Sequence, residues 1–125
     1  MAQIFLAIAA MFGGLSVAAG AFGSHALRAQ LSDRALEIFE TGARYQMYHA
    51  LALLAVGILL TRAESVPPTL PFAGFAFIIG TVIFSGSLYA LSISNIKWLG
   101  AITPFGGAFF IAGWACLAIA ALQYK

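Results

Sequence analysis

Four long apolar runs constrain the fold of this chain more than any other feature of its sequence. They cover residues 4–22, 43–60, 70–93 and 99–122, and the only charged side chain among them is Arg44, near the start of the second run. An α-helix needs about 20 predominantly apolar residues to cross the hydrocarbon core of a bilayer. The runs therefore predict four transmembrane helices, which together use most of the chain.

The composition excludes a water-soluble protein. Hydrophobic residues make up 62% of the 125 residues and charged residues 8%, whereas soluble domains carry about 25% charged residues. The net charge of +2 comes without a basic run, so we expect no nucleic-acid partner. Cys116 is the only cysteine, which rules out an intrachain disulfide and a cysteine-based metal cluster.

The polar link between the first two runs has the pattern of a short amphipathic helix over residues 33–41. Ser32 precedes it as an N-cap candidate, and Asp33 suits the positive end of the helix dipole. Leu36 and Phe39 fall on one side of the helical wheel, opposite the charged residues. We expect this helix to lie in the membrane interface, separate from the second span.

These elements define the expected fold class: an all-α integral membrane four-helix bundle with a short interfacial helix between spans one and two, forming a single domain over residues 1–125. Basic residues accumulate in the cytoplasmic links of membrane proteins. The first and third links carry four of them and the opposite side carries two, so both termini are expected outside the cytoplasm. The first group is Arg28, Arg34, Arg44 and Lys97, and the second is Arg62 and Lys125.

Small residues at helical spacing indicate where helices approach one another closely. In the first span they recur every four positions, and in the third and fourth spans they form short clusters. Small side chains allow the backbones of neighbouring membrane helices to pack tightly. The predicted helix-contact residues are Ser16, Gly20, Ser24, Ser85, Gly86, Ser87, Gly106 and Gly107.

A second group of polar residues is expected to meet at the membrane face that holds the first and third links. Polar side chains at membrane depth usually face the bundle interior or a cavity. The predicted cluster is His25, Arg44, Tyr45, Gln46, His49 and Thr103. Two histidines on adjacent helices could bind a haem or a metal, or relay a proton. A structural role in closing the first link onto the bundle is the stronger interpretation, and no metal or cofactor is expected.

Four motifs, in order along the chain, closely resemble one family of small membrane proteins. Residues 20–27 read GAFGSHAL, residues 39–52 read FETGARYQMYHALA, residues 84–89 read FSGSLY, and residues 103–107 read TPFGG. The resemblance is to the domain of unknown function 423 family, an uncharacterised UPF-type family with animal relatives, and it covers essentially the whole chain. It implies a compact multi-pass protein of the bacterial plasma membrane with no assigned biochemical activity, and it supplies no catalytic residues.

Two classes of function remain open from the sequence. One is a non-enzymatic accessory protein whose partners are the lipid bilayer, other membrane proteins or further copies of itself. The other is a small oligomeric transporter or channel. All four acidic residues lie in the links between the apolar runs, which disfavours proton-coupled export through a membrane-embedded carboxylate. No nucleophile–base pair supports an intramembrane enzyme.

Overall fold

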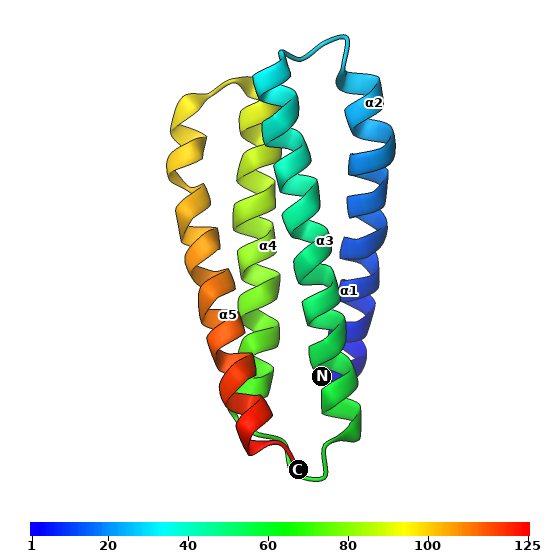
Figure 1. Ribbon diagram of the computed structural model, residues 1–125, viewed down its shortest axis with the longest axis vertical. Helices are drawn as coiled ribbons and strands as arrows, with labels where there is room; N and C mark the ends of the chain where they lie inside the picture. The colour runs from blue at the N-terminus through cyan, green and yellow to red at the C-terminus, as the bar shows by residue number, and fades with distance from the viewer.

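The computed structural model describes residues 1–125, and every regular element in it is helical (Figure 1). Four helical segments are long and apolar enough to cross a membrane, which confirms the predicted four-helix membrane bundle. The elements in chain order are α1 (Ala2–Val17), the π-helix η1 (Ala18–Gly23), α2 (Ser24–Leu27), α3 (Asp33–Arg62), α4 (Thr69–Ser94), the 3-10 helix η2 (Lys97–Ala101) and α5 (Thr103–Gln123). Both termini lie at the end of the bundle that holds the link between α3 and α4 (Figure 1).

The first span is one helical rod built from α1, η1 and α2. It continues to Leu27, five residues beyond the predicted end at Phe22. A wider π-helical turn occupies its last third, where Ala18–Gly23 reads AAGAFG. Gly23 faces the ring of Phe39 on α3, and a Cβ at this position would lie 3.1 Å from that ring. The small residues of this stretch therefore let the rod lie close against α3.

The predicted interfacial helix over residues 33–41 is helical, but it is wrong as a separate element. Ser32 forms the predicted N-cap, its Oγ accepting a hydrogen bond from the backbone N–H of Ala35 at 3.1 Å. From there α3 continues without interruption to Arg62. Gly42 provides room for the Tyr89 ring of α4, because a Cβ at this position would lie 2.9 Å from that ring. Helix α3 is therefore continuous and packs against α4 where the sequence pattern predicts two separate helices.

The helices form an open row rather than a closed ring. Helix α3 packs against α1 on one side and α4 on the other, and α4 packs against α5. Helices α1 and α5 lie at opposite ends of the row and do not pack along each other (Figure 1). Only 29 of the 125 residues are buried, so most side chains face the surroundings. In a membrane protein these surroundings are lipid tails, which cost apolar side chains nothing to contact.

Phenylalanines packed against glycines of other helices hold the row together. In each of four pairs a Cβ on the glycine would come within 2.8 Å of the phenylalanine. Three of the contacts are made by rings, with Phe5 over Gly74, Phe77 over Gly113 and Phe110 over Gly80, whereas Phe84 meets Gly106 with its backbone and Cβ. Three of the four pairs join α4 to α5, which explains how these two helices approach so closely.

The adjacent glycines Gly106 and Gly107 provide a matched test of this packing. A Cβ on Gly106 would lie 2.7 Å from the Cβ of Phe84, whereas a Cβ on Gly107 would have no neighbour within 4 Å. We expect Gly106→Ala to lower the stability of the detergent-solubilised protein by about 1–3 kcal/mol through overpacking. Gly107→Ala should leave stability unchanged or raise it slightly, because alanine is the better helix former. Equal thermal unfolding midpoints for the two variants would contradict the close α4–α5 contact.

Candidate functional site

Hydrogen bonds from side chains to backbone carbonyls join α1 to α3 inside the membrane-spanning region. The buried Ser16 Oγ donates to the carbonyl of Ala43 at 2.6 Å. The amide Nε2 of Gln46 donates to the carbonyl of Phe12 at 2.8 Å, and its Oε1 accepts from the Tyr89 hydroxyl of α4, also at 2.8 Å. Gln46 therefore connects three helices. Both ends of its amide group are occupied by protein partners.

Helix α4 makes equivalent contacts with its two neighbours. The buried Ser85 Oγ donates to the carbonyl of Gly42 on α3 at 2.7 Å. The Ser87 hydroxyl lies 2.6 Å from the Thr103 hydroxyl at the start of α5 and donates to the carbonyl of Phe84 at 3.0 Å. These polar groups are satisfied within the protein, as a hydrocarbon environment requires.

His49 joins α3 to α5 across a gap that their backbones do not close. Its Nδ1 lies 2.7 Å from the carbonyl of Tyr45, and its Nε2 lies 3.1 Å from the indole N–H of Trp114. Because the indole N–H is only a donor, Nε2 must accept, and the ring proton must reside on Nδ1. The ring also stacks on Phe110, with centroids 3.5 Å apart and planes at 6°. His49 is therefore a neutral imidazole with both nitrogens engaged.

An aromatic groove of about 490 Å³ lies around this histidine, between α3 and α5. Helix α4 contributes Phe84 to it. Tyr48, Ile111 and Trp114 are 50%, 73% and 48% exposed, so the groove opens onto the surface that faces the lipid. Its lining residues are Tyr45, Tyr48, His49, Phe84, Gly107, Phe110, Ile111 and Trp114. The groove presents ring faces to the bilayer, and its histidine has no free nitrogen.

The predicted polar cluster does not form one site. His25 is exposed at the end of the first rod, and Arg44 is exposed on the outer face of α3. Thr103 bonds to Ser87, and Gln46 turns toward α1 and α4. The structure brings together only Tyr45 and His49, whose rings stack at 6.3 Å.

His49 lies further from the start of its helix than the apolar run indicates. The second apolar run begins at residue 43, which places His49 near a membrane face. Helix α3 begins ten residues earlier, at Asp33, and His49 lies just past the midpoint of its 30 residues. His49 therefore lies near the middle of α3 along its length, with its partners inside the bundle.

The predicted helix-contact residues divide into two groups. One group lies against neighbouring helices as described above: Ser16, Ser85, Ser87 and Gly106. Gly20 belongs to the same group, because a Cβ added there would lie 3.9 Å from the Cβ of Ala43. The Oγ of Ser24 is buried without a hydrogen-bond partner. The prediction is wrong for Gly86 and Gly107, where a Cβ would meet nothing within 4 Å.

Sequence reasoning missed the partners of His49. Phe110 and Trp114 are four residues apart on α5, so they share one helix face, and this spacing was the available signal. Nothing in the sequence states which helix this face meets. No group of three or more His, Cys, Asp or Glu side chains is placed to hold a metal ion.

The fold and these contacts define a polytopic helical membrane protein whose interior polar groups are nearly all bonded to one another. The chain belongs to the family described as protein of unknown function (DUF423), whose model matches residues 19–107. It is 43% identical over 122 residues to a UPF0382 membrane protein of Staphylococcus epidermidis and 41% identical over 122 residues to the UPF0382 membrane protein YwdK of Bacillus subtilis. Each match covers 98% of both chains. No solved structure matches the chain significantly.

The two histidines provide a paired prediction. We expect His49→Gln to destabilise the solubilised protein by about 1–3 kcal/mol, because the Trp114 N–H and the ring stack on Phe110 lose their partner. His25→Gln is the matched control and should leave the thermal unfolding midpoint unchanged, since His25 is exposed.

The same preparations test the structural role of the histidines directly. The wild-type protein should show no Soret absorbance and less than one equivalent of bound metal. A Soret band or stoichiometric metal that either substitution removes would contradict this role.

Proposed function

We propose that this protein is a non-enzymatic accessory component of the membrane that works by associating with lipid at its bilayer-facing surface. The observation that carries this proposal is the state of His49. His49 is the residue best suited to bind a metal or relay a proton, but both of its ring nitrogens are bonded to protein groups. The groove around it offers aromatic faces to the bilayer.

The shape and lining of the groove support lipid as its occupant. Six of its eight lining residues are hydrophobic, and an aliphatic chain packs well against ring faces. A concave apolar surface at mid-depth in a bilayer is in contact with acyl chains unless a protein partner covers it. Ordered acyl chains along the α3–α5 groove would therefore be part of the native assembly.

The interior polar contacts disfavour the alternative of a small oligomeric transporter or channel. A conduction path needs a series of polar groups that can exchange partners with the moving solute. Here the interior groups of Ser16, Gln46, His49 and Ser85 are occupied by protein donors and acceptors. Thr81 is the one buried hydroxyl near the middle of α4 without a partner, and a single hydroxyl does not form a path.

Native mass spectrometry from mild detergent, combined with solute flux in liposomes, separates these two functions. We expect the purified protein to retain lipid and to give no flux above empty liposomes. Ile111→Trp should lower lipid retention, because the indole fills the groove from its exposed rim. The matched control Ile119→Trp, on the same helix at a position that is 46% exposed outside the groove, should leave retention unchanged. A closed ring of subunits with reconstituted flux would contradict the proposal.

We further propose that the membrane is the plasma membrane and that both termini lie outside the cytoplasm. The first and third links, which carry Arg28, Arg34 and Lys97, lie at one end of the bundle, and the termini lie at the other (Figure 1). Arg44 belongs to the same end of α3. The excess of basic residues at this end supports its placement in the cytoplasm.

Reporter fusions at Lys125 test this orientation. Alkaline phosphatase, which is active outside the cytoplasm, should be active when fused after Lys125, and a fluorescent reporter that matures only in the cytoplasm should be dark. The same two reporters inserted after Leu31 provide the matched control and should show the opposite activities. Cytoplasmic fluorescence from the Lys125 fusion would contradict the orientation.

A further inference from the structure

The outer face of α3 changes from charged to apolar along the length of the helix. Its N-terminal half carries a stripe of four charged residues, Arg34, Glu37, Glu40 and Arg44, of which Glu40 is half-buried and the other three are exposed. Further along the same face, Tyr48, Leu51 and Ile58 are 50%, 57% and 46% exposed. We call the first set the charged stripe. One helix face therefore offers charge near the membrane surface and apolar side chains beneath it.

The charged stripe lies at the depth of lipid-facing apolar residues on both neighbouring helices. The contacts of Ala43 with Ser16 and of Gly42 with Ser85 fix the levels of α1 and α4 against α3. Counting residues along these antiparallel helices places Glu37 near the level of Phe22, which is 72% exposed, and Arg34 near the level of Ile93, which is 62% exposed. Glu40 and Arg44 lie still deeper. The stripe therefore reaches below the bilayer surface.

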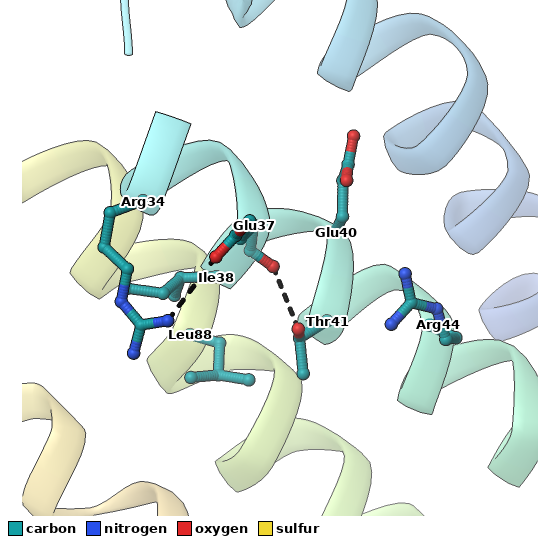
Figure 2. Close-up of a pocket in the computed structure, with 7 residues that line it drawn as sticks. All are labelled: Arg34, Glu37, Ile38, Glu40, Thr41, Arg44 and Leu88. Carbon is teal, nitrogen blue, oxygen red and sulfur yellow. Dashed lines mark hydrogen bonds and ion pairs between the residues drawn. The ribbon is translucent and has the colours of Figure 1, made fainter. Parts of the chain in front are cut away.

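The two deepest charges of the stripe have no partner in the protein. Arg34 forms an ion pair with Glu37 at 3.5 Å, and this is the only salt bridge in the molecule. Glu40 and Arg44 are one helical turn apart, yet they do not pair, and the Glu40 carboxylate points away from the Arg44 guanidinium (Figure 2). A charge at this depth is costly without a counter-ion. Both groups therefore require a partner from outside the chain.

Two hollows flank these charges and share them. One, of about 450 Å³, lies toward α4, where Leu88 contributes to its lining (Figure 2). The other, of about 370 Å³, lies toward α1, where Ser16 and Gly20 contribute. Glu40 and Arg44 line both hollows. The space beside the two charges is therefore sufficient for a headgroup and the start of an acyl chain.

We propose that the charged stripe binds the headgroup of a zwitterionic phospholipid that carries a primary ammonium, that is, a phosphatidylethanolamine. Arg44 binds the phosphate, as guanidinium groups do through paired N–H donors. Glu40 accepts hydrogen bonds from the ammonium group. The order of charges agrees with this arrangement: Arg44 is deeper than Glu40, and in this lipid the phosphate is deeper than the ammonium. The acyl chains then lie along Tyr48 and Leu51.

Two other headgroup classes fit this surface less well. A purely anionic headgroup would satisfy Arg44 but would meet the carboxylates of Glu37 and Glu40, which repel it. A choline headgroup has the required charges, but its quaternary nitrogen has no N–H to donate to Glu40. The site therefore distinguishes headgroups by the donor capacity of the cationic group as well as by charge.

This inference rests on the proposed association with lipid and specifies the headgroup. It is tested by native mass spectrometry of the full chain with equimolar phosphatidylethanolamine, phosphatidylcholine and phosphatidylglycerol of identical acyl chains. We expect the wild-type protein to prefer phosphatidylethanolamine over phosphatidylcholine by about tenfold, the range of one charge-assisted hydrogen bond. Stepwise methylation of the amine, tested on the wild-type protein, should abolish the preference once the last N–H is lost.

Substitutions of the two charges should have different effects. Glu40→Gln should make phosphatidylethanolamine and phosphatidylcholine bind equally, whereas Arg44→Gln should weaken both by about tenfold, because both contain the phosphate. Arg62→Gln at the opposite end of α3 and Glu64→Gln in the following link are the matched controls. They make the same two types of substitution away from the charged stripe and should leave the headgroup preference unchanged.

Three results would overturn the headgroup assignment while leaving lipid association intact. These are equal binding of the ethanolamine and choline lipids by the wild-type protein, stronger binding of phosphatidylglycerol, and a preference that survives Glu40→Gln. Failure to retain any lipid would instead contradict the proposed function itself. A lipid-free dimer whose contact depends on Glu40 and Arg44 would assign the stripe to a second copy of the chain and would also overturn this proposal.

Discussion

The structure depends on one constraint: inside the hydrocarbon core, polar groups must find partners within the protein, because no water is available. Helix α3 lies between α1 and α4, and its Gln46 and His49 make several of these contacts. Gln46 binds the Phe12 carbonyl and the Tyr89 hydroxyl, and His49 accepts from Trp114. These contacts connect α3 to each of the other three membrane helices. Lipid tails give apolar surfaces no net reason to associate, so such hydrogen bonds and the phenylalanine–glycine contacts must fix which helices meet.

Because of the same constraint, the charged groups that lack a protein partner lie on the outer surface of the molecule. Interior donors and acceptors are largely paired with one another, whereas the deep charges on the outer face of α3 have no protein partner. The aromatic groove between α3 and α5 is likewise open to the surroundings. The row of helices leaves both surfaces uncovered because α1 and α5 do not close it into a ring. We therefore propose that the protein acts through what binds its surface.

Local patterns in the sequence predicted the features that depend on neighbouring residues alone, namely the helical spans and a helix cap. Apolar run length located the four spans, and Ser32 was identified as the N-cap of α3. Contacts between helices were harder to predict, because periodicity states which residues share a face and not which helix meets that face. The charges of residues 33–41 therefore suggested a separate interfacial helix, since nothing local shows that Gly42 receives the Tyr89 ring. For the same reason His25 and Arg44 were grouped with His49, although His49 lies deep within α3 and its partners are on α5.

The central claim is that His49 is a fully satisfied structural residue. Nitrogen-15 solid-state NMR of the histidine-labelled protein in lipid bilayers tests it most directly. We expect, for His49, one protonated Nδ1 and one unprotonated, hydrogen-bonded Nε2, with a through-space correlation from Nε2 to the indole proton of Trp114. That correlation should disappear in Trp114→Phe, which keeps an aromatic ring but removes the donor. A His49 ring protonated on Nε2, or one with no correlation to the indole, would contradict the account.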